Sequence, residues 1–206
     1  MTKNWFMCID MELNQALRIG ILASSGYGKT YLTQTLIKQM ATQHKEIKYI
    51  YYNTDFESLP MIRGLKNVII FEPDKELNDD LGYLNTFILD MRSKYSNCML
   101  IIDDLDLFFD GNSSMSLKSK ELKNLFSNGR HQRFGCIWMS KALKYIPKKV
   151  ISNTDVFFIG NFVEKDDIDR LRGFVDINII RKLTKPVFLR YDRRDLPNQR
   201  MKLVKA

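Results

Sequence analysis

One stretch, residues 23–30, constrains the fold of this chain more than any other and reads Ala-Ser-Ser-Gly-Tyr-Gly-Lys-Thr. It directly follows an apolar run, Leu17–Leu22, and precedes a helix-like stretch, Tyr31–Thr42. A buried strand, a loop of small residues and a helix, in that order, are the context that a phosphate-binding P-loop requires. The pattern normally begins with Gly, whereas this chain has Ala23. The stretch therefore predicts a Walker A motif and, with it, a nucleotide site.

The residue types in this loop are those that hold a triphosphate. Gly26 and Gly28 permit a tight turn in which successive backbone N–H groups converge on a phosphate. The positive end of the following helix adds to the field there. Lys29, which we also count as catalytic, is expected to reach the β and γ phosphates, and Thr30 to place its hydroxyl on a magnesium ion. We thus expect ATP and Mg²⁺ as cofactors, with these nucleotide-binding residues: Ser24, Ser25, Gly26, Tyr27, Gly28, Lys29, Thr30 and Tyr31.

A second apolar run, Cys98–Ile102, ends in two carboxylates, Asp103 and Asp104. This is the form of a Walker B motif, and we expect its strand to lie beside the P-loop strand. Asp103 is expected to hold magnesium, directly or through water. Asp104 is expected to polarise the attacking water, as general base or water orienter. Asp106 is a weaker candidate, with capping of the next turn as its alternative role.

Apolar runs and helix-length stretches alternate along the chain. Such alternation indicates an α/β fold with a mainly parallel sheet, covered by helices on both faces and binding ligands at the carboxyl ends of its strands. We expect one domain over residues 1–206, with an added edge strand at Trp5–Ile9. The other expected strands are Leu17–Leu22, Ile47–Tyr52, Asn67–Phe71, Cys98–Ile102, Cys136–Met139, Val156–Ile159 and Val187–Tyr191. The expected helices are Tyr31–Thr42, Leu81–Tyr95, Leu117–Asn128 and Glu164–Leu171.

The composition of the chain indicates which kinds of partner it can have. The net charge of +8 favours a polyanion such as DNA or RNA, although charge also serves solubility. No apolar run is long enough to cross a membrane, and the first ten residues lack the pattern of a secretory signal. Cys98 and Cys136 lie in apolar runs, which predicts buried thiols. The two histidines have no metal-ligand spacing with the three cysteines, which argues against a structural metal.

A third segment carries a resemblance to a known family. The turn Gly129-Arg130-His131 is followed by an apolar strand, then Ser140, Ile146-Pro147 and Ile151-Ser152-Asn153. Together with the Walker motifs, this arrangement resembles the viral genome-packaging ATPases of the FtsK–HerA superfamily, in the branch of poxviruses and archaeal icosahedral viruses. The resemblance implies a RecA-like P-loop NTPase core, magnesium-dependent ATP hydrolysis, a ring-shaped oligomer and translocation of double-stranded DNA into a preformed capsid.

The same resemblance implies two further catalytic residues. The family usually has Gln after the third-motif strand as a sensor of the γ-phosphate, and Ser140-Lys141 stands at that place here. Ser140 is expected to hydrogen-bond the attacking water or the phosphate, and Lys141 to add charge. A neighbouring subunit is expected to supply an arginine that stabilises transition-state charge. Arg130 matches the family's turn, and the alternatives are Arg133, Arg170 and Arg172.

Basic clusters provide candidate DNA contacts, because a translocating motor touches phosphates without reading sequence. For each cluster the alternative is a solvated surface. The first comprises Lys141, Lys144, Lys148 and Lys149; the second comprises Arg190, Arg193, Arg194, Arg200, Lys202 and Lys205; the third comprises Lys118, Lys120 and Lys123.

The leading hypothesis for function is an ATP-hydrolysing motor that packages a viral genome. The alternatives are a small-molecule or nucleotide kinase and a nucleotide-dependent assembly scaffold. The motor hypothesis implies double-stranded DNA, further copies of the chain in a ring, and capsid or portal-region proteins as partners. It also implies a place in the host cytoplasm during assembly, association with the virion and no membrane span.

Overall fold

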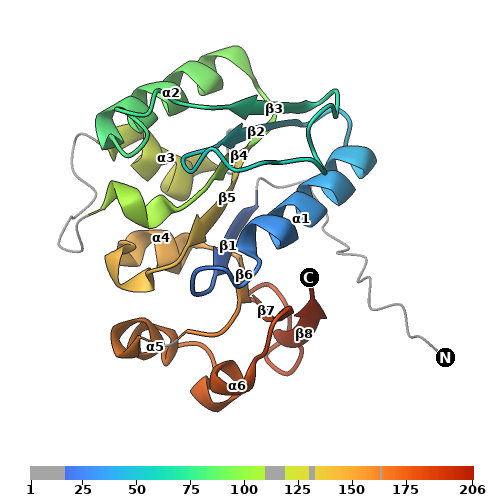
Figure 1. Ribbon diagram of the computed structural model, residues 1–206, viewed down its shortest axis with the longest axis vertical. Helices are drawn as coiled ribbons and strands as arrows, with labels where there is room; N and C mark the ends of the chain where they lie inside the picture. Colours follow the sequence, from blue (N-terminus) through green and yellow to red (C-terminus); the bar gives the residue numbers. More distant parts are fainter. Residues whose placement is uncertain (1–16, 110–118, 130–132, 163) are drawn as a thin grey trace.

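The computed structural model describes residues 17–109, 119–129, 133–162 and 164–206, so the expected strand Trp5–Ile9 lies outside it. The described chain forms one eight-stranded sheet in the order β3-β2-β4-β5-β1-β6-β7-β8 (Figure 1). The strands from β3 to β6 in that order are mutually parallel, and β7 and β8 add antiparallel pairings at one edge. The bounds are β1 Arg18–Leu22, β2 Lys48–Tyr52, β3 Val68–Phe71, β4 Cys98–Ile102, β5 Phe134–Ser140, β6 Val156–Ile159, β7 Val187–Asp192 and β8 Met201–Lys205.

Helices cover both faces of this sheet, which confirms the predicted mainly parallel α/β fold. Because both faces are covered, the central strands are mainly apolar, and every residue of β1, β4 and β5 is buried. The helices are α1 Lys29–Gln43, α2 Leu81–Lys94, α3 Lys120–Asn128, α4 Lys148–Asn153, α5 Lys165–Leu171 and α6 Ile177–Lys182, with short 3₁₀ turns at Leu105–Phe108 and Leu143–Tyr145.

Two hydrophobic cores hold the layers together, one on each face. On one face, Leu36 and Ile37 of α1 pack in a cluster with Ile21 of β1. On the other, α2 and α3 contribute to a cluster that includes Trp138 of β5 and Phe157 of β6. Figure 1 shows α1 on the opposite side of the sheet from α2, α3 and α4. Each large apolar side chain buried in this way contributes about 1.5–3 kcal/mol.

The strand order differs from the sequence expectation at one point that matters for the site. The strand that ends in the twin aspartates, β4, does not lie beside the P-loop strand β1, because β5 lies between them. Ile137 of β5 pairs with Ile19 of β1 on one side and with Ile101 of β4 on the other. The carboxyl end of β5 therefore lies between the two Walker motifs.

The described chain also contains elements that the sequence did not predict. Strand β8 and the short helices α4 and α6 are the main additions. In β8 four of the five residues are exposed, so the strand lacks the apolar run that marks the others. In the described part of the chain, no helix has both the length and the apolar character needed to span a membrane.

Candidate active site

The loop between β1 and α1 adopts the conformation that its glycines allow. Gly26 has φ of +65° and Gly28 has φ of +104°, both in the left-handed region that favours glycine. The loop is anchored at its start, because the Ala23 N–H donates to the Ser140 carbonyl at 3.3 Å and the Ser24 N–H donates to the Asn161 carbonyl at 3.1 Å. Gly28 then leads directly into the N-terminus of α1. The loop thus places backbone N–H groups and a helix N-terminus at the carboxyl edge of the sheet.

A polar cavity of about 280 Å³ opens at this edge. It brings together P-loop residues and residues that follow β2, β4 and β5. The lining residues are Ser25, Gly26, Gly28, Lys29, Thr30, Asp55, Glu57, Asp103, Asp104 and Lys141. The predicted Walker A and Walker B groups therefore share one cavity, of a size that suits a small ligand.

Three of the predicted nucleotide-binding residues do not line this cavity: Ser24, Tyr27 and Tyr31. Tyr27 is buried, its hydroxyl donates to the Val187 carbonyl at 2.8 Å, and its ring packs edge-on against Phe188. The side chain thus ties the P-loop to β7. Tyr31 is exposed on α1.

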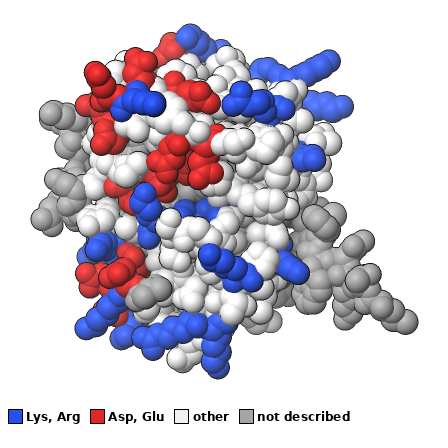
Figure 2. Space-filling model, viewed as in Figure 1, with Lys and Arg blue, Asp and Glu red and all other residues white. Residues whose placement is uncertain are grey.

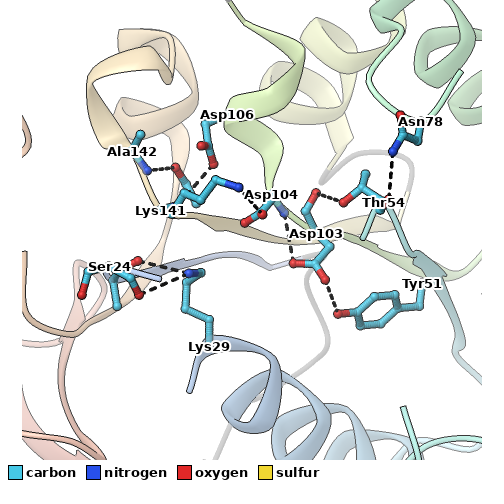
Figure 3. A network of polar contacts seen from close by, with 12 residues as sticks. Ser24, Lys29, Tyr51, Thr54, Asn78, Asp103, Asp104, Asp106, Lys141 and Ala142 are labelled. Carbon is cyan, nitrogen blue, oxygen red and sulfur yellow. Dashed lines mark hydrogen bonds and ion pairs between the residues drawn. The ribbon is translucent and has the colours of Figure 1, made fainter. Parts of the chain in front are cut away.

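Lys29 is a buried lysine that faces the cavity. Its Nζ donates to the Ala23 carbonyl at 3.2 Å and to the Ser24 carbonyl at 3.5 Å (Figure 3). Burial lowers the pKa of Lys29, and the carboxylates of Asp104 and Asp103 partly offset that effect. An ammonium group held by two carbonyls beside a nest of N–H groups creates a site for an anion.

Asp103 is almost fully buried at the tip of β4. Its Oδ1 accepts the Asp104 N–H at 3.0 Å, and its Oδ2 accepts the Tyr51 hydroxyl at 3.1 Å (Figure 3). Burial, reinforced by the negative charge of Asp104, raises the pKa of Asp103 to about 7. Because ionisation of this buried carboxyl group is unfavourable, a nearby cation would stabilise its charged form, which fits the predicted magnesium role.

Asp104 has the left-handed backbone conformation, with φ of +40° and ψ of +56°, which is unusual for a residue other than glycine. This turn directs its carboxylate into the cavity, where the Nζ of Lys141 donates to Oδ2 at 2.9 Å. The side chain of Asp55 lies within hydrogen-bonding reach of Asp104. Burial and this neighbouring carboxylate raise the pKa of Asp55. Asp104 therefore lies between a cation and a second carboxyl group.

Ser140 is fully buried and is not among the cavity-lining residues. Its Oγ accepts the Ala142 N–H at 3.2 Å, and its hydroxyl also bonds the side chain of Asp106. Asp106 in turn accepts the Lys141 N–H at 3.2 Å. Ser140 and Asp106 thus fix the backbone that follows β5, and the residue whose side chain reaches the cavity is Lys141.

Sequence reasoning missed Asp55 and Glu57. Both follow β2, which pairs in parallel with β4 from Lys48↔Cys98 to Tyr52↔Ile102. Because the carboxyl ends of neighbouring parallel strands meet at one edge, acids after β2 reach the same cavity as Asp103. Two acids within a few residues of the end of the apolar run Ile47–Tyr52 were the available signal. The candidate arginine, Arg130, lies outside the described residues.

Residues 8–195 match the family described as poxvirus A32 protein. The structure is similar to that of the genome packaging NTPase B204 from Sulfolobus turreted icosahedral virus 2 in complex with ATP-gammaS, with a TM-score of 0.71 and 18% identity over 95% of this chain and 98% of that one. It is also similar to B204, the DNA-packaging ATPase from Sulfolobus turreted icosahedral virus, with a TM-score of 0.72 and 17% identity over 93% and 98% of the two chains.

A third solved structure, the pCW3 conjugation coupling protein TcpA, has a TM-score of 0.66 and 14% identity over 95% of this chain and 61% of that one. At these identities the likeness establishes the fold, that of a P-loop NTPase. No curated protein sequence matches the chain. The family match covers most of the chain and includes both Walker motifs. The chain therefore belongs to the poxvirus A32 protein family.

Proposed function

We propose that this protein is an ATP-hydrolysing motor that moves double-stranded DNA into a viral capsid. The observation that carries the proposal is the cavity in which the P-loop lysine, the threonine after it and the twin aspartates meet. The cavity alone would suit any P-loop NTPase. The family match and the likeness to two packaging ATPases support a packaging motor among these proteins.

Within this cavity the P-loop residues bind the nucleotide. The N–H groups from Gly26 to Thr30 and the Lys29 ammonium hold the phosphates. Thr30 and Asp103 would hold a magnesium ion, whose other ligands are phosphate oxygens and waters. The described part of the chain contains no cluster of three or more acidic, His or Cys side chains that could hold a metal ion. The ion would neutralise charge on the terminal phosphates.

Asp104 is the general base of the proposed reaction. Its carboxylate lies in the cavity beside Lys141 and would accept a proton from the attacking water. The left-handed turn at Asp104 holds this carboxylate in the cavity rather than along the strand axis.

We also propose that a neighbouring copy in a ring supplies Arg130 to this cavity. Among the described residues that line it, the cations are Lys29 and Lys141 and there is no arginine. A nucleotide kinase of this size would need arginines over its phosphoryl acceptor, so the described lining does not favour that alternative.

The basic clusters differ in their freedom to contact DNA. Lys148 and Lys149 are exposed at the start of α4. In contrast, Arg190 is buried and paired with Asp192, and Arg194 is paired with the same carboxylate. Arg190 of β7 and Arg194, just after that strand, are therefore engaged in ion pairs within the fold, and Lys148 and Lys149 are the first candidate DNA contacts. Lys118 lies outside the described residues.

Basic side chains are prominent along the rim at one end of the visible face. Figure 2 shows most of the acidic side chains in the upper half, with basic ones among them, and many basic side chains over α5 and α6, where a smaller acidic group also lies. Exposed basic residues of that rim are Lys165, Arg172, Arg181, Lys182 and Lys185. We include this rim among the surfaces proposed to face DNA, because exposed cations attract a polyanion.

Capsid or portal-region proteins would anchor the ring, and the protein would act in the host cytoplasm during assembly and stay associated with the virion.

The decisive experiment measures phosphate release with and without double-stranded DNA, alongside the mass of the protein in solution. A motor releases phosphate faster with DNA and forms an oligomer with nucleotide. Transfer of phosphate to a nucleoside would identify a kinase instead, and nucleotide-dependent assembly without phosphate release would identify a scaffold. DNA affinity should fall steeply with salt, since contacts to phosphates release counterions.

A further inference from the structure

The cavity at the carboxyl edge of the sheet suits phosphates and offers little to a nucleoside. Apart from its glycines, every described residue that lines it is polar or charged, and none has an aromatic or aliphatic side chain. Sites for flat organic groups are instead lined mainly by apolar surface. If a triphosphate occupies this cavity, its sugar and base must therefore lie outside it, against another part of the molecule.

The order of the strands indicates on which side the nucleoside lies. The carboxylates proposed to act on the terminal phosphate follow β4, which lies two strands from β1. On the other side of β1 come β6 and then β7, so β4 and β7 lie on opposite sides of the P-loop strand (Figure 1). A phosphate chain whose terminal group faces β4 directs its nucleoside away from β4. The nucleoside then lies toward β6 and β7.

A turn that precedes β7 is fixed to the P-loop on that side. Because β7 runs antiparallel to β6, its first residue, Val187, lies at the edge of the sheet that holds the P-loop. The Val187 N–H donates to the Thr184 carbonyl at 2.8 Å, which closes a turn over residues 184–187. Lys185 and Pro186 form the centre of this turn. The Val187 carbonyl accepts the hydroxyl of Tyr27, from the P-loop, at 2.8 Å, so the turn is tied to the P-loop.

Asn161, which follows β6, forms a second link between the two segments. Its carbonyl accepts the Ser24 N–H at 3.1 Å, and its side-chain amide donates to the Leu183 carbonyl at 3.3 Å. The P-loop and the 184–187 turn are thus connected by two separate sets of hydrogen bonds. The fold therefore fixes the distance between them.

Lys185 extends from this turn to the outer side of the P-loop. Its Nζ lies 3.8 Å from the point that a Cβ atom of Gly26 would occupy. Gly26 lines the phosphate cavity, whereas Lys185 does not. The side chain of Lys185 is exposed, and within the described residues its ammonium forms no hydrogen bond or ion pair. A cation with available donors therefore lies beside the P-loop and outside the phosphate cavity.

The chemistry of a lysine side chain fits a nucleoside at this place. The methylene stem is apolar and packs along apolar surfaces, such as the face of a base, while the ammonium keeps its contacts with polar atoms. The ammonium has three donors and no acceptor, which suits the oxygens of a ribose. A nucleoside beside the P-loop would cover the stem of Lys185 and bind its ammonium at the same time.

We propose that the 184–187 turn forms the subsite for the sugar and base of the nucleotide, with Lys185 as its contact residue. The stem of Lys185 covers one face of the base, and its ammonium donates to a ribose oxygen. This inference rests on the proposed ATPase function and deepens it, because it gives the site a way to distinguish a nucleoside triphosphate from an inorganic triphosphate. The phosphates occupy the cavity, and only the nucleoside reaches the turn.

The test measures the affinities of a non-hydrolysable ATP analogue and of inorganic tripolyphosphate for wild type, Lys185→Ala and Lys38→Ala. Lys38 is the matched control, because it is an exposed lysine of α1 that also has no ion pair within the described residues. For Lys185→Ala we expect about a tenfold loss of affinity for the ATP analogue, the size of one lost charge-assisted hydrogen bond. Its affinity for tripolyphosphate should change less than about twofold at physiological salt, because salt screens an exposed charge outside the cavity. Lys38→Ala should match wild type for both ligands.

Two further variants separate the stem of Lys185 from its ammonium. Lys185→Met keeps an apolar stem and lacks the charge, so its loss of affinity for the ATP analogue should lie between those of wild type and Lys185→Ala. Lys185→Arg keeps both a stem and a cation and should retain most of the affinity. If Lys185→Met binds the ATP analogue as tightly as wild type does, the ammonium makes no contact and the ribose assignment is wrong.

The other outcomes distinguish this inference from the proposed function. Equal losses for both ligands in Lys185→Ala would mean that Lys185 attracts the phosphates from a distance, and would overturn the subsite. Unchanged affinity for the ATP analogue with weaker DNA binding would place Lys185 on the DNA-facing rim and would overturn it too. In both cases, ATP hydrolysis by wild type leaves the ATPase proposal intact. If wild type binds neither ligand, the proposed function itself fails. Because Lys185 is exposed, its variants should fold, and thermal unfolding of each one checks this.

Discussion

The hydroxyl of Tyr51 donates a hydrogen bond to Oδ2 of Asp103 at 3.1 Å, which joins the ends of the neighbouring strands β2 and β4. The bond is buried, so it fixes the orientation of the carboxylate proposed to hold magnesium. For Tyr51→Phe we expect a loss of about 1–3 kcal/mol in the free energy of unfolding, because a buried charged acceptor loses its donor. We also expect the magnesium concentration for half-maximal ATP hydrolysis to rise several-fold. Chemical denaturation and a magnesium titration of the activity measure the two effects.

Tyr49→Phe is the matched control, because Tyr49 lies on the same strand and is equally buried. Within the described residues its hydroxyl has no hydrogen-bond partner. Removing that hydroxyl should leave stability unchanged or improve it, and should leave the magnesium dependence as in wild type. The same loss in both variants would show that packing of the β2 tyrosines, rather than the Asp103 contact, determines the effect.

Gly160 gives a second prediction, because a methyl group does not fit there. A Cβ atom at Gly160 would lie 2.5 Å from the ring of Tyr27 and 2.7 Å from the Cβ of Ala23, both in the P-loop segment. Gly160→Ala should therefore displace the P-loop, lower nucleotide affinity and cost about 1–3 kcal/mol of stability. Gly173→Ala is the control, since nothing lies within 4 Å of the added methyl group. Calorimetric titration with nucleotide measures the affinity, and equal affinities for both variants would contradict the prediction.

The strands with continuous apolar sequences could be predicted from the sequence, and the peripheral elements could not. The bounds of β4 and β6 were predicted to the residue, because both strands are buried and their ends are marked by polar residues or by glycine. Strand β8 contains both basic and apolar residues and is mostly exposed. Its formation depends on pairing with β7, from Val187↔Lys205 to Tyr191↔Met201, and a tertiary pairing of this kind leaves little local signal.

The site shows the same division between local and tertiary information. The P-loop and the twin aspartates are local motifs, so the sequence identified the residues that line most of the cavity. Asp55 and Glu57 enter it only through the order of the strands, which no local pattern specifies. The sequence also does not show which side chain after β5 faces the cavity. In the structure the hydroxyl of Ser140 is used by Ala142 and Asp106, and Lys141 faces the cavity instead.

The buried thiols give a prediction about pH. Burial raises the pKa of Cys98 to about 12 and also raises the pKa of Cys136. In the unfolded chain a thiol loses its proton near pH 8.5. Above that pH the unfolded state releases protons that the native state keeps, so the free energy of unfolding should decrease as the pH rises from about 8 to about 10.

In a Cys8→Ser variant, neither thiol should react with Ellman's reagent at pH 8 until denaturant is added. Rapid labelling of the native variant would contradict the burial of these thiols.

Asp104→Asn tests the division of roles between the twin aspartates. The amide keeps the shape of the side chain, including an oxygen for Lys141, but it does not accept a proton from water at neutral pH. We expect ATP binding to be retained and kcat to fall by about 10²–10⁴, the range for loss of a general base.

Lys29→Ala, in contrast, should weaken nucleotide binding itself, because the cation beside the phosphate nest is gone. Single-turnover measurements with saturating protein separate the two defects. If Asp104→Asn hydrolyses ATP at the wild-type rate, then Asp104 is not the base, and Asp55, the carboxyl within hydrogen-bonding reach of it, becomes the residue to substitute next.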